Sequence, residues 1–406
     1  MKSVGIVVEY NPFHNGHKHH LEMARKVSNA DIVIGVMSGD YVQRGEPAAF
    51  NRWERAEIAL KNGVDIIAEL PIFYSTQNAE LFAKGALEIL AELGVKDIVF
   101  GSETANLEKL EKIVEVTQCK EYEEILKEEL QKGNAYPKAS STALERLGVE
   151  PSSKSNDILG IEYIRSSKKV GINLIPIKRV GAGYHDKGVV EGFSSATGIR
   201  QMLSSEDTDI DEIKKVVPEE TYNHLLNLLG HLTENPHSEN LGKIVKLEDF
   251  YPLIRYEIIN NCDSLIKIQD VEEGLDLRLY ECAKKHDSYL KFKESLSTKR
   301  YTAGRVQRVL IHILIGLTKE LTSEIKFREK TPYIRVLGFN ENGRRYLNHI
   351  KKSREEDSPK IITSLSNIRR DLTVEERKFL EFNEKASLIY KMLSNYEDRK
   401  IPLMIK

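Results

Sequence analysis

The sequence predicts an α/β fold: a parallel sheet with helices on both faces, followed by a mainly α-helical C-terminal part. Short β-branched runs alternate with helical patterns over the first hundred residues. These runs are apolar throughout instead of alternating with polar residues, which is typical of strands buried on both faces. After residue 205 the chain turns to helical stretches rich in Lys, Glu and Leu, with almost no strand signal.

Four strands with three helices between them are expected in the first hundred residues. The elements, in chain order, are the strand Val4–Val8, the helix Gly16–Ser28, the strand Asp31–Met37, the helix Asn51–Asn62 before Gly63, the strand Asp65–Leu70 before Pro71, the helix Ala79–Leu93 before Gly94 and the strand Asp97–Phe100. Glycine or proline directly after a periodic segment marks its end. Because parallel sheets of this kind bind ligands at the carboxyl ends of their strands, the loops after these four strands form the expected site.

A further helical and strand pattern follows before the character of the chain changes. Its segments are a charged helical region over Leu107–Leu147, a helix over Ile158–Ser167, a strand over Asn173–Lys178, a flexible loop at Gly181–His185 and a short helix opened by Ser194–Arg200. The change of pattern then predicts two domains, residues 1–205 and 206–406.

Composition excludes several classes of protein. The 406 residues carry 60 Lys and Arg against 62 Asp and Glu, a net charge of −2, so the chain is no histone-like polycation. No apolar run approaches the roughly 20 residues that a membrane helix needs, and the first residues lack a signal-peptide pattern, so we expect a soluble protein of the cytoplasm. Cys119, Cys262 and Cys282 are odd in number and widely spaced, which argues against a disulfide framework or a structural zinc site.

The strongest motif is Glu9–His17, EYNPFHNGH, directly after the first strand. Pro12 ends the strand, Gly16 lets a phosphate approach the backbone, and the new helix offers N–H groups to an anion. His14 and His17 can donate hydrogen bonds to the α-phosphate of a nucleotide as pyrophosphate leaves. The alternative is a pair of ordinary turn histidines.

Two more histidines, His19 and His20, raise the hypothesis of a metal site formed with His14 and His17. No thiolate or carboxylate set nearby completes such a site, so zinc is not expected. His20 lies one turn after His17 and is expected to face the nucleotide, whereas His19 is expected in solvent.

The H-x-G-H element resembles the signature of the nucleotidyltransferase superfamily, and longer runs are similar to the bacterial tRNA(Met) cytidine acetate ligase family. These runs are VGIVVEYNPFHNGH at 4–17, MSGDYVQRGEP at 37–47, DIIAELP at 65–71, FGSE at 100–103, NDILGIEY at 156–163, KRVGAGYHD at 178–186, SSATGIR at 194–200, KRYTAGRVQRVL at 299–310 and YIRVLGFNENGR at 333–344. The resemblance therefore covers nearly the whole chain.

The resemblance implies a Rossmann-like nucleotidyltransferase domain over residues 1–205 and a helical tRNA-binding domain over 206–406. It implies an ATP-dependent ligase that activates acetate as acetyl-adenylate. The acetyl group then passes to the exocyclic amine of the wobble cytidine of elongator tRNA(Met), which forms N4-acetylcytidine and releases AMP. ATP, acetate and this tRNA are the expected partners, without a membrane or DNA. Mg²⁺ is expected with ATP because it bridges phosphates, but no carboxylate can be assigned to it or to an acetate pocket.

The resemblance also implies an ATP site formed by the segment from Val7 to His20 together with Gly101, Asn156 and Arg179. From the first segment the expected residues are Val7, Val8, Glu9, Tyr10, Asn11, Pro12, Phe13, His14, Asn15, Gly16, His17 and His20. Gly101 leaves room for an adenine or ribose. Asn156 can bind a base or ribose edge, with a helix N-cap as its alternative, and Arg179 can bind phosphate, with a solvated position as its alternative.

The segment Ser195–Arg200 resembles the second superfamily signature, a phosphate-binding loop at a helix start. Ser195 and Thr197 would hold the β- and γ-phosphates while Arg200 neutralises charge. A plain capping motif is the alternative.

Basic residues in the second half favour RNA. Six lie between Tyr289 and Arg308 against one acid, and five lie between Gly343 and Arg354 with no acid. The candidate tRNA-binding residues are Arg300, Arg305, Arg308, Arg344 and Arg345. The helix with Arg305 and Arg308 carries apolar residues on its other face, so its basic face is expected outward, and Tyr301 and Tyr346 are possible stacking surfaces. The alternative is a solvated charged face.

Two other functions stay open at this point. An adenylyltransferase acting on a small phosphorylated cofactor precursor would use the same first domain, but it leaves the helical half without a role. A non-catalytic tRNA-binding protein would not need the intact H-x-G-H element.

Overall fold

The computed structural model describes residues 1–180, 192–204, 210–229, 244–297, 301–394, 396 and 398–405. The strands are β1 (Ser3–Val8), β2 (Ile32–Ser38), β3 (Tyr41–Val42), β4 (Glu46–Pro47), β5 (Ile66–Leu70), β6 (Asp97–Ser102), β7 (Asn173–Lys178), β8 (Ile334–Asn340), β9 (Ile361–Ile362) and β10 (Leu403–Ile405).

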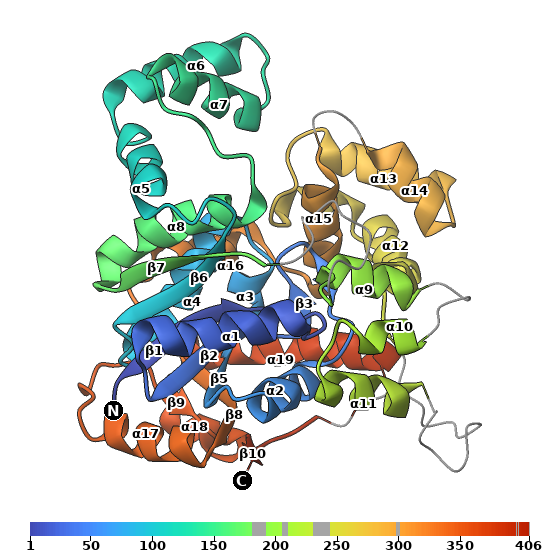
Figure 1. Cartoon of the computed structure of the whole chain (residues 1–406). Helices are drawn as coiled ribbons and strands as arrows, with labels where there is room; N and C mark the ends of the chain where they lie inside the picture. The colour runs from blue at the N-terminus through green and yellow to red at the C-terminus, as the bar shows by residue number, and fades with distance from the viewer. Residues whose placement is uncertain are drawn as a thin grey trace.

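Helices make up most of the remaining described chain (Figure 1). They are α1 (Asn15–Ser28), α2 (Arg52–Lys61), α3 (Ile72–Ser75), α4 (Ala79–Glu92), α5 (Leu107–Val116), α6 (Lys120–Gln131), α7 (Tyr136–Arg146), α8 (Ser155–Val170), α9 (Ala196–Met202), α10 (Ile210–Lys214), α11 (Glu219–Leu228), α12 (Tyr251–Asn260), α13 (Leu275–Lys285), α14 (Tyr289–Leu296), α15 (Ala303–Ile315), α16 (Lys319–Phe327), α17 (Glu341–Lys351), α18 (Ile368–Asp371) and α19 (Val374–Ser394). Short 3₁₀ turns lie at Leu247–Phe250, Cys262–Lys267 and Leu365–Asn367.

One sheet organises the fold, in the order β10-β8-β5-β2-β1-β6-β7, with β9 beside β8. The strands from β5 to β7 are parallel, and β1 pairs in register with β2 from Ser3 opposite Ile32 to Val8 opposite Met37. This confirms the predicted α/β fold class. Because the chain runs outward from β1 first to β2 and β5 and then to β6 and β7, the order reverses between β1 and β6, where such sheets open a crevice.

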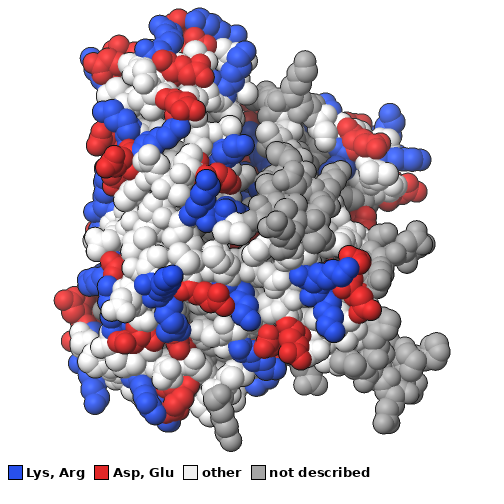
Figure 2. All heavy atoms as spheres, in the orientation of Figure 1, with Lys and Arg blue, Asp and Glu red and all other residues white. Residues whose placement is uncertain are grey.

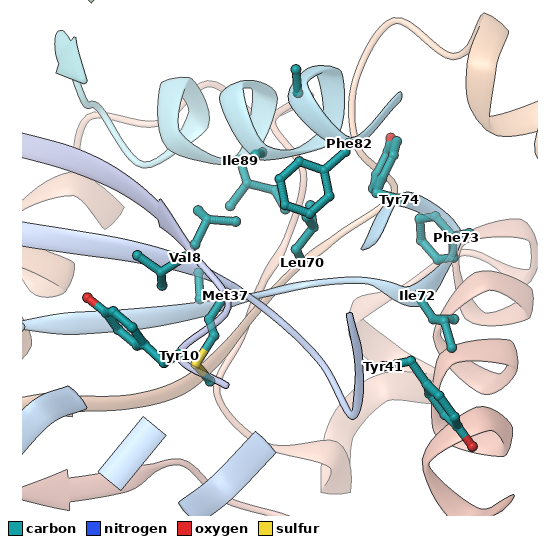
Figure 3. Packing of buried hydrophobic residues seen from close by; sticks show 14 of the residues in the cluster. Val8, Tyr10, Met37, Tyr41, Leu70, Ile72, Phe73, Tyr74, Phe82 and Ile89 are labelled. Carbon is teal, nitrogen blue, oxygen red and sulfur yellow. The ribbon is translucent and has the colours of Figure 1, made fainter. Parts of the chain in front are cut away.

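Apolar side chains fill the space between the sheet and its helices. Gly5 in β1 has no room for a side chain, because a Cβ would lie 2.8 Å from Leu90 of α4. Figure 3 shows Val8 of β1, Met37 of β2 and Phe82 of α4 packed near the carboxyl ends of the strands. A buried apolar layer therefore lies at this end of the sheet.

Strand β8 corrects the expectation that almost no strand follows residue 205. It runs antiparallel to β5, with Ile66 opposite Phe339, and β10 extends the sheet beyond it. The sheet thus takes strands from both parts of the chain, and residues 205–209, at the proposed boundary, lie outside the described residues. The division into residues 1–205 and 206–406 stays a prediction.

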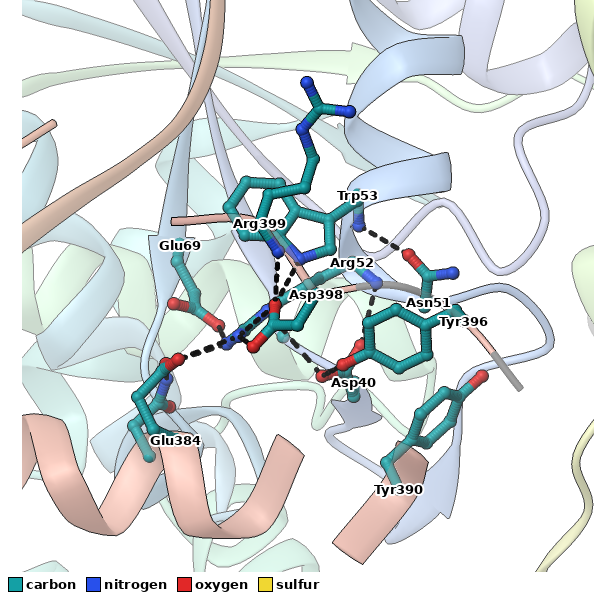
Figure 4. Close-up of polar contacts among 12 residues, drawn as sticks. Asp40, Asn51, Arg52, Trp53, Glu69, Glu384, Tyr390, Tyr396, Asp398 and Arg399 are labelled. Carbon is teal, nitrogen blue, oxygen red and sulfur yellow. Dashed lines mark hydrogen bonds and ion pairs between the residues drawn. The ribbon is translucent and has the colours of Figure 1, made fainter. Parts of the chain in front are cut away.

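A buried group of ionised side chains joins the first part of the chain to its end (Figure 4). The side chain of Arg52 in α2 is fully buried and lies 3.0 Å from Glu69, 3.1 Å from Glu384 and 3.2 Å from Asp398. Arg335 of β8 pairs with the same Glu384. Helix α19 and the C-terminal segment are thereby held against β5 and α2.

The surface carries both signs of charge. Lys, Arg, Asp and Glu are interspersed over the face that Figure 2 shows. In the described part of the chain no helix is both long and apolar enough to cross a membrane.

Candidate active site

A pocket opens at the carboxyl ends of β1, β6 and β7, where the strand order reverses. Most of the predicted ATP-binding residues line it: Val7, Val8, Glu9, Tyr10, Asn11, His14, Gly16, His17, His20, Gly101, Asn156, Arg179, Ser195, Thr197 and Arg200. Pro12, Phe13 and Asn15 are not among the lining residues.

His14 and His17 cap the first turn of α1 with their own rings. The Nδ1 atom of His14 accepts a hydrogen bond from the N–H of Gly16 at 3.0 Å, and Nδ1 of His17 accepts from the N–H of His14 at 3.3 Å. A neutral imidazole that accepts at Nδ1 carries its proton on Nε2. The two rings stack 3.7 Å apart, so the capping geometry assigns one Nε2–H donor to each of two adjacent rings.

Both histidines are neutral over the ordinary pH range. Burial lowers the pKa of His14 to about 3, and the charge of Arg179 adds to this effect. Burial also lowers the pKa of His17, with further contributions from His14 and Arg179. The pair therefore offers hydrogen bonds without bringing two positive charges into the free pocket.

The need for glycine at position 16 has a more specific cause than the approach of a phosphate. A Cβ at this position would lie 2.9 Å from Cε1 of His14, so any larger residue would displace the capping ring. Phe13 is fully buried with its ring 5.8 Å from that of His17, and the side chain of Asn15 donates to the carbonyls of Gly192 and Lys215. Phe13 and Asn15 thus hold the motif in place from outside the pocket.

Of the other two histidines of α1, His20 lies where it was expected and His19 does not. His19 is half-buried and lines the pocket, which corrects its expected place in solvent. His20 also lines the pocket, and its Nε2 lies 3.2 Å from the carbonyl of Val99 in β6. Burial lowers the pKa of His20 to about 4. In the described part of the chain no three His, Cys, Asp or Glu side chains come together as a metal site.

Asn156 and Arg179 form one hydrogen-bonded chain with Glu103. The amide of Asn156 donates to Glu103 at 2.7 Å and accepts from Arg179 at 2.7 Å. Helix α8 begins at Ser155, and the N-cap alternative for Asn156 is wrong, because Glu103 accepts the N–H of Asp157 instead. The exposed Arg179 is thus held beside the pocket.

At the start of α9 the same residue caps the helix and lines the pocket. Ser195 caps the helix by accepting the N–H of Gly198 at 3.0 Å, as the capping alternative predicts, and it also lines the pocket. Arg200 donates to the carbonyl of Asn11 at 2.8 Å and lies 3.1 Å from Glu46. The second signature is therefore tied to the first through this arginine.

Several lining residues were missed by motif reasoning. They are Val42 and Gln43 of the β3–β4 hairpin, and Phe82, Leu159 and Tyr163 on α4 and α8. Arg44 and Glu46 also line the pocket, as their place after the second strand predicts. The run at 37–47 pointed to the hairpin as part of the family pattern, but it carries no motif with a readable chemistry. The residues on α4 and α8 look like ordinary apolar helix positions.

The candidate tRNA-binding residues do not share one surface. Arg305 and Arg308 of α15 are partly buried, and they pair with Glu272 at 2.6 Å and with Asp270 at 3.6 Å. This corrects the expectation of a fully outward basic face. Arg300 lies outside the described residues.

Arg344 and Arg345 are exposed on α17, which lies at the amino ends of the parallel strands, away from the pocket. The N–H of Asn340 before this helix donates to the carbonyl of Asp65 at 3.0 Å, just ahead of β5. Tyr346 is buried and bonds Ser3, and Tyr301 is buried as well, so neither offers an open stacking surface.

Comparisons with known proteins agree on one family. A family model described as HIGH Nucleotidyl Transferase matches residues 1–401. A protein of Fusobacterium nucleatum subsp. nucleatum named tRNA(Met) cytidine acetate ligase is 43% identical over 99% of this chain and 98% of its own length. A protein of the same name from Caldanaerobacter subterraneus is 40% identical over 96% and 95%.

Solved structures show the same likeness. The apo form of Thermotoga maritima TmcAL has a TM-score of 0.90 at 34% identity, and the form bound with alpha-thio ATP has a TM-score of 0.87 at 35% identity. Both matches cover 100% of each chain.

Proposed function

Because this chain belongs to the HIGH nucleotidyl transferase family and to the tRNA(Met) cytidine acetate ligases, we propose that it activates acetate with ATP and acetylates the wobble cytidine of elongator tRNA(Met). The products are N4-acetylcytidine, AMP and pyrophosphate. The observation that carries the proposal is the pair of stacked, neutral histidines at the crevice, each with an Nε2–H donor. ATP binding is supported by the nucleotide analogue in the Thermotoga relative.

The first step needs charge stabilisation at the α-phosphate. Acetate attacks the α-phosphorus, a new P–O bond forms, and the bond to pyrophosphate breaks. His14 and His17 donate hydrogen bonds to the oxygens on which negative charge builds up. Donors that are already oriented in the free protein need no reorganisation during the reaction, which is the source of their effect.

The β- and γ-phosphates and the nucleoside of ATP need binding residues on either side of these histidines. Arg200, Ser195 and Thr197 are proposed to hold the β- and γ-phosphates, and Gly101, Asn156 and Arg179 the nucleoside. Both oxygens of Glu46 are already paired in the pocket, with Arg200 and with Gln307. We therefore expect Mg²⁺ to bind mainly through phosphate oxygens, where it neutralises their charge.

Acetate is proposed to lie at the apolar side of the pocket. Phe82 and Leu159 line that side, and Tyr163 stands one turn further along α8. A methyl group is stabilised by such a wall, while Arg44 at the hairpin supplies a positive charge to the carboxylate.

The tRNA is proposed to approach from the side of α15, which packs against the β3–β4 hairpin at the pocket wall. Arg305→Glu should weaken tRNA binding and reduce the salt dependence of binding, because each lost phosphate contact lowers its slope by about one. The matched control is Arg344→Glu, also in a helix and also paired with a glutamate, but on the opposite edge of the sheet. Equal losses in filter-binding titrations of both variants would contradict this placement.

The function is tested with purified protein, ATP, acetate and tRNA(Met). We expect acetate-dependent exchange of pyrophosphate into ATP, and N4-acetylcytidine by mass spectrometry of tRNA nucleosides. Exchange that depends on a phosphorylated cofactor precursor instead of acetate would favour the adenylyltransferase. Binding of tRNA without ATP turnover would favour a non-catalytic protein.

A further inference from the structure

Two carboxylates line the pocket, and they differ in what their oxygens contact. Glu46 is fully engaged, since Oε2 lies 3.1 Å from Arg200 and Oε1 accepts from Gln307 at 2.9 Å. Glu9 uses only Oε1, which accepts the backbone N–H of Gln43 at 2.7 Å. Within the described residues Oε2 of Glu9 has no hydrogen-bond partner, and it is left for a ligand.

The position of Glu9 is defined from three sides. It directly follows β1 and precedes His14 by five residues, so it belongs to the same wall as the two histidines. Its backbone carbonyl accepts from the buried Arg55 at 2.7 Å. Its carboxylate is bound by Gln43 of the β3–β4 hairpin, which fixes the side chain toward that hairpin.

The same hairpin contacts α15 on its other side. Gln307 of α15 donates to Glu46, and Gly45 is packed so closely that a Cβ would lie 2.3 Å from the backbone nitrogen of Arg308. Glu9 therefore lies between the histidines at the α-phosphate and the side from which the tRNA is proposed to arrive. A cytidine amine that reaches the acetyl group from there passes this carboxylate.

We propose that Glu9 is the catalytic residue that accepts the proton of the cytidine amine during acetyl transfer. The inference rests on the proposed function. In this step N4 of cytidine attacks the acetyl carbonyl carbon and the C–N bond forms. The C–O bond to the phosphate breaks, AMP leaves with the bonding electron pair, and the proton from N4 passes to Oε2 of Glu9.

The surroundings of Glu9 favour its role as a proton acceptor. Burial raises the pKa of Glu9, and this increase is only partly offset by the Gln43 N–H and by Arg55, Arg200 and Arg44. Tyr163 of α8 lines the same pocket, and its pKa is raised by burial and, to a smaller extent, by the charge of Glu9. A carboxylate with a raised pKa is a stronger base than an exposed one.

The neighbouring histidines fit the role less well. His14 and His17 already carry their protons on Nε2 and accept backbone N–H groups at Nδ1, so neither nitrogen is open to a proton. His19 also lines the pocket and is the competing candidate.

The test compares Glu9→Gln with the wild type in each half-reaction. Glu9 also lines the ATP pocket, but the glutamine keeps an oxygen for the Gln43 N–H, so acetate-dependent pyrophosphate exchange should fall much less than transfer does. Single-turnover transfer to tRNA(Met) should slow about 100-fold, at the lower end for the loss of a general base. The wild-type transfer rate should rise with pH as Glu9 ionises, and the variant should lose that dependence.

Glu88→Gln is the matched control, because Glu88 is also buried with a raised pKa but lies outside the pocket. It should keep both half-reactions. Transfer by Glu9→Gln at the wild-type rate, an equal loss of both half-reactions, or a loss confined to transfer in His19→Asn would overturn the inference. Absence of acetate-dependent exchange in the wild type would instead refute the proposed function.

Discussion

His14 and His17 show how one side chain can build a helix start and a reaction site together. Each ring uses Nδ1 to satisfy a backbone N–H of the first turn, which leaves Nε2–H as a donor. The cap therefore determines the tautomer. A sequence motif predicts which residues meet a phosphate, but the protonated nitrogen follows from the local hydrogen bonds.

Removing either ring should slow adenylate formation. His14→Ala and His17→Ala are each expected to reduce acetate-dependent pyrophosphate exchange by about 100-fold, as when an oxyanion donor is lost. His14→Asn is the matched variant, because asparagine is a good N-cap but does not place a donor where Nε2 lies. If His14→Asn restored the rate as well as the stability, the assigned role would be wrong.

Acid should destabilise the fold through the same side chains. A histidine whose folded pKa is lowered binds its proton more readily when unfolded, so stability is complete above about pH 6.5 and falls as the pH drops toward the folded pKa. Each of His14, His17 and His20 adds a slope of about 1.4 kcal/mol per pH unit below 6.5.

Urea denaturation between pH 6.5 and 5 measures this slope. His14→Asn should reduce it by one histidine's share. The exposed His349 is the control, since His349→Asn removes a side chain that is solvated in both states. A wild-type stability that stays constant over this range would contradict the prediction.

At the scale of elements, the β3–β4 hairpin connects the pocket to the helical part. Gln43 contacts Glu9 on one side, and Gly45 contacts the backbone of α15 on the other. Gly45 has φ +73°, which glycine adopts without strain. Both the turn and the close approach therefore require glycine at this position.

Gly45→Ala should separate the hairpin from α15. The Cβ would overlap backbone atoms that cannot rotate away, in addition to the strain of a positive φ. We expect a lower free energy of unfolding and slower transfer to tRNA. Gly133→Ala is the control, because Gly133 has φ +82° but nothing within 4 Å of a Cβ. Equal effects of the two changes on stability and transfer would show that the contact with α15 does not matter.

At the scale of the molecule, the buried ion cluster joins segments more than three hundred residues apart. Arg52 and Arg335 lie 5.4 and 5.3 Å from the centre of the Trp53 ring, and the indole N–H donates to Asp398 at 2.7 Å. Burial would raise the pKa of Glu384, but the two arginines reverse this and lower it. Glu384 is therefore ionised, and its charge depends on these partners.

Arg52→Ala should lower the free energy of unfolding by about 3 to 5 kcal/mol, because it removes the buried guanidinium that Glu69, Glu384 and Asp398 share. Hydrogen exchange should also rise in α19, which this cluster holds. Arg52→Lys should lower the free energy of unfolding by less, since lysine keeps the positive charge but cannot pair with two carboxylate oxygens in the parallel geometry of a guanidinium. The exposed Arg345→Ala is the control. An unchanged urea midpoint in Arg52→Ala would contradict the prediction.

Much of the sheet was predictable because its strands are local apolar runs. The strand Asn173–Lys178 has the predicted bounds, and the four strands and three helices predicted in the first hundred residues differ from expectation by at most two residues at either end. Strand β8 was missed because it is a single short run among charged helices, and its place beside β5 is decided by partners far away in the sequence. Tyr346 was misjudged for the same reason: its hydroxyl meets Ser3 and the carbonyl of Leu93.

The sequence by itself determined the alternation of strands and helices, the crevice at the carboxyl ends and the two histidines that face it, because each depends on neighbours within a few residues. Only the tertiary structure decided the tautomer of those histidines, the free oxygen of Glu9 and the separation of the arginines on α15 from those on α17. Each of these depends on atoms that folding brings together from distant segments, and hydrogen bonds and burial act over a few ångströms of space whatever the distance along the chain.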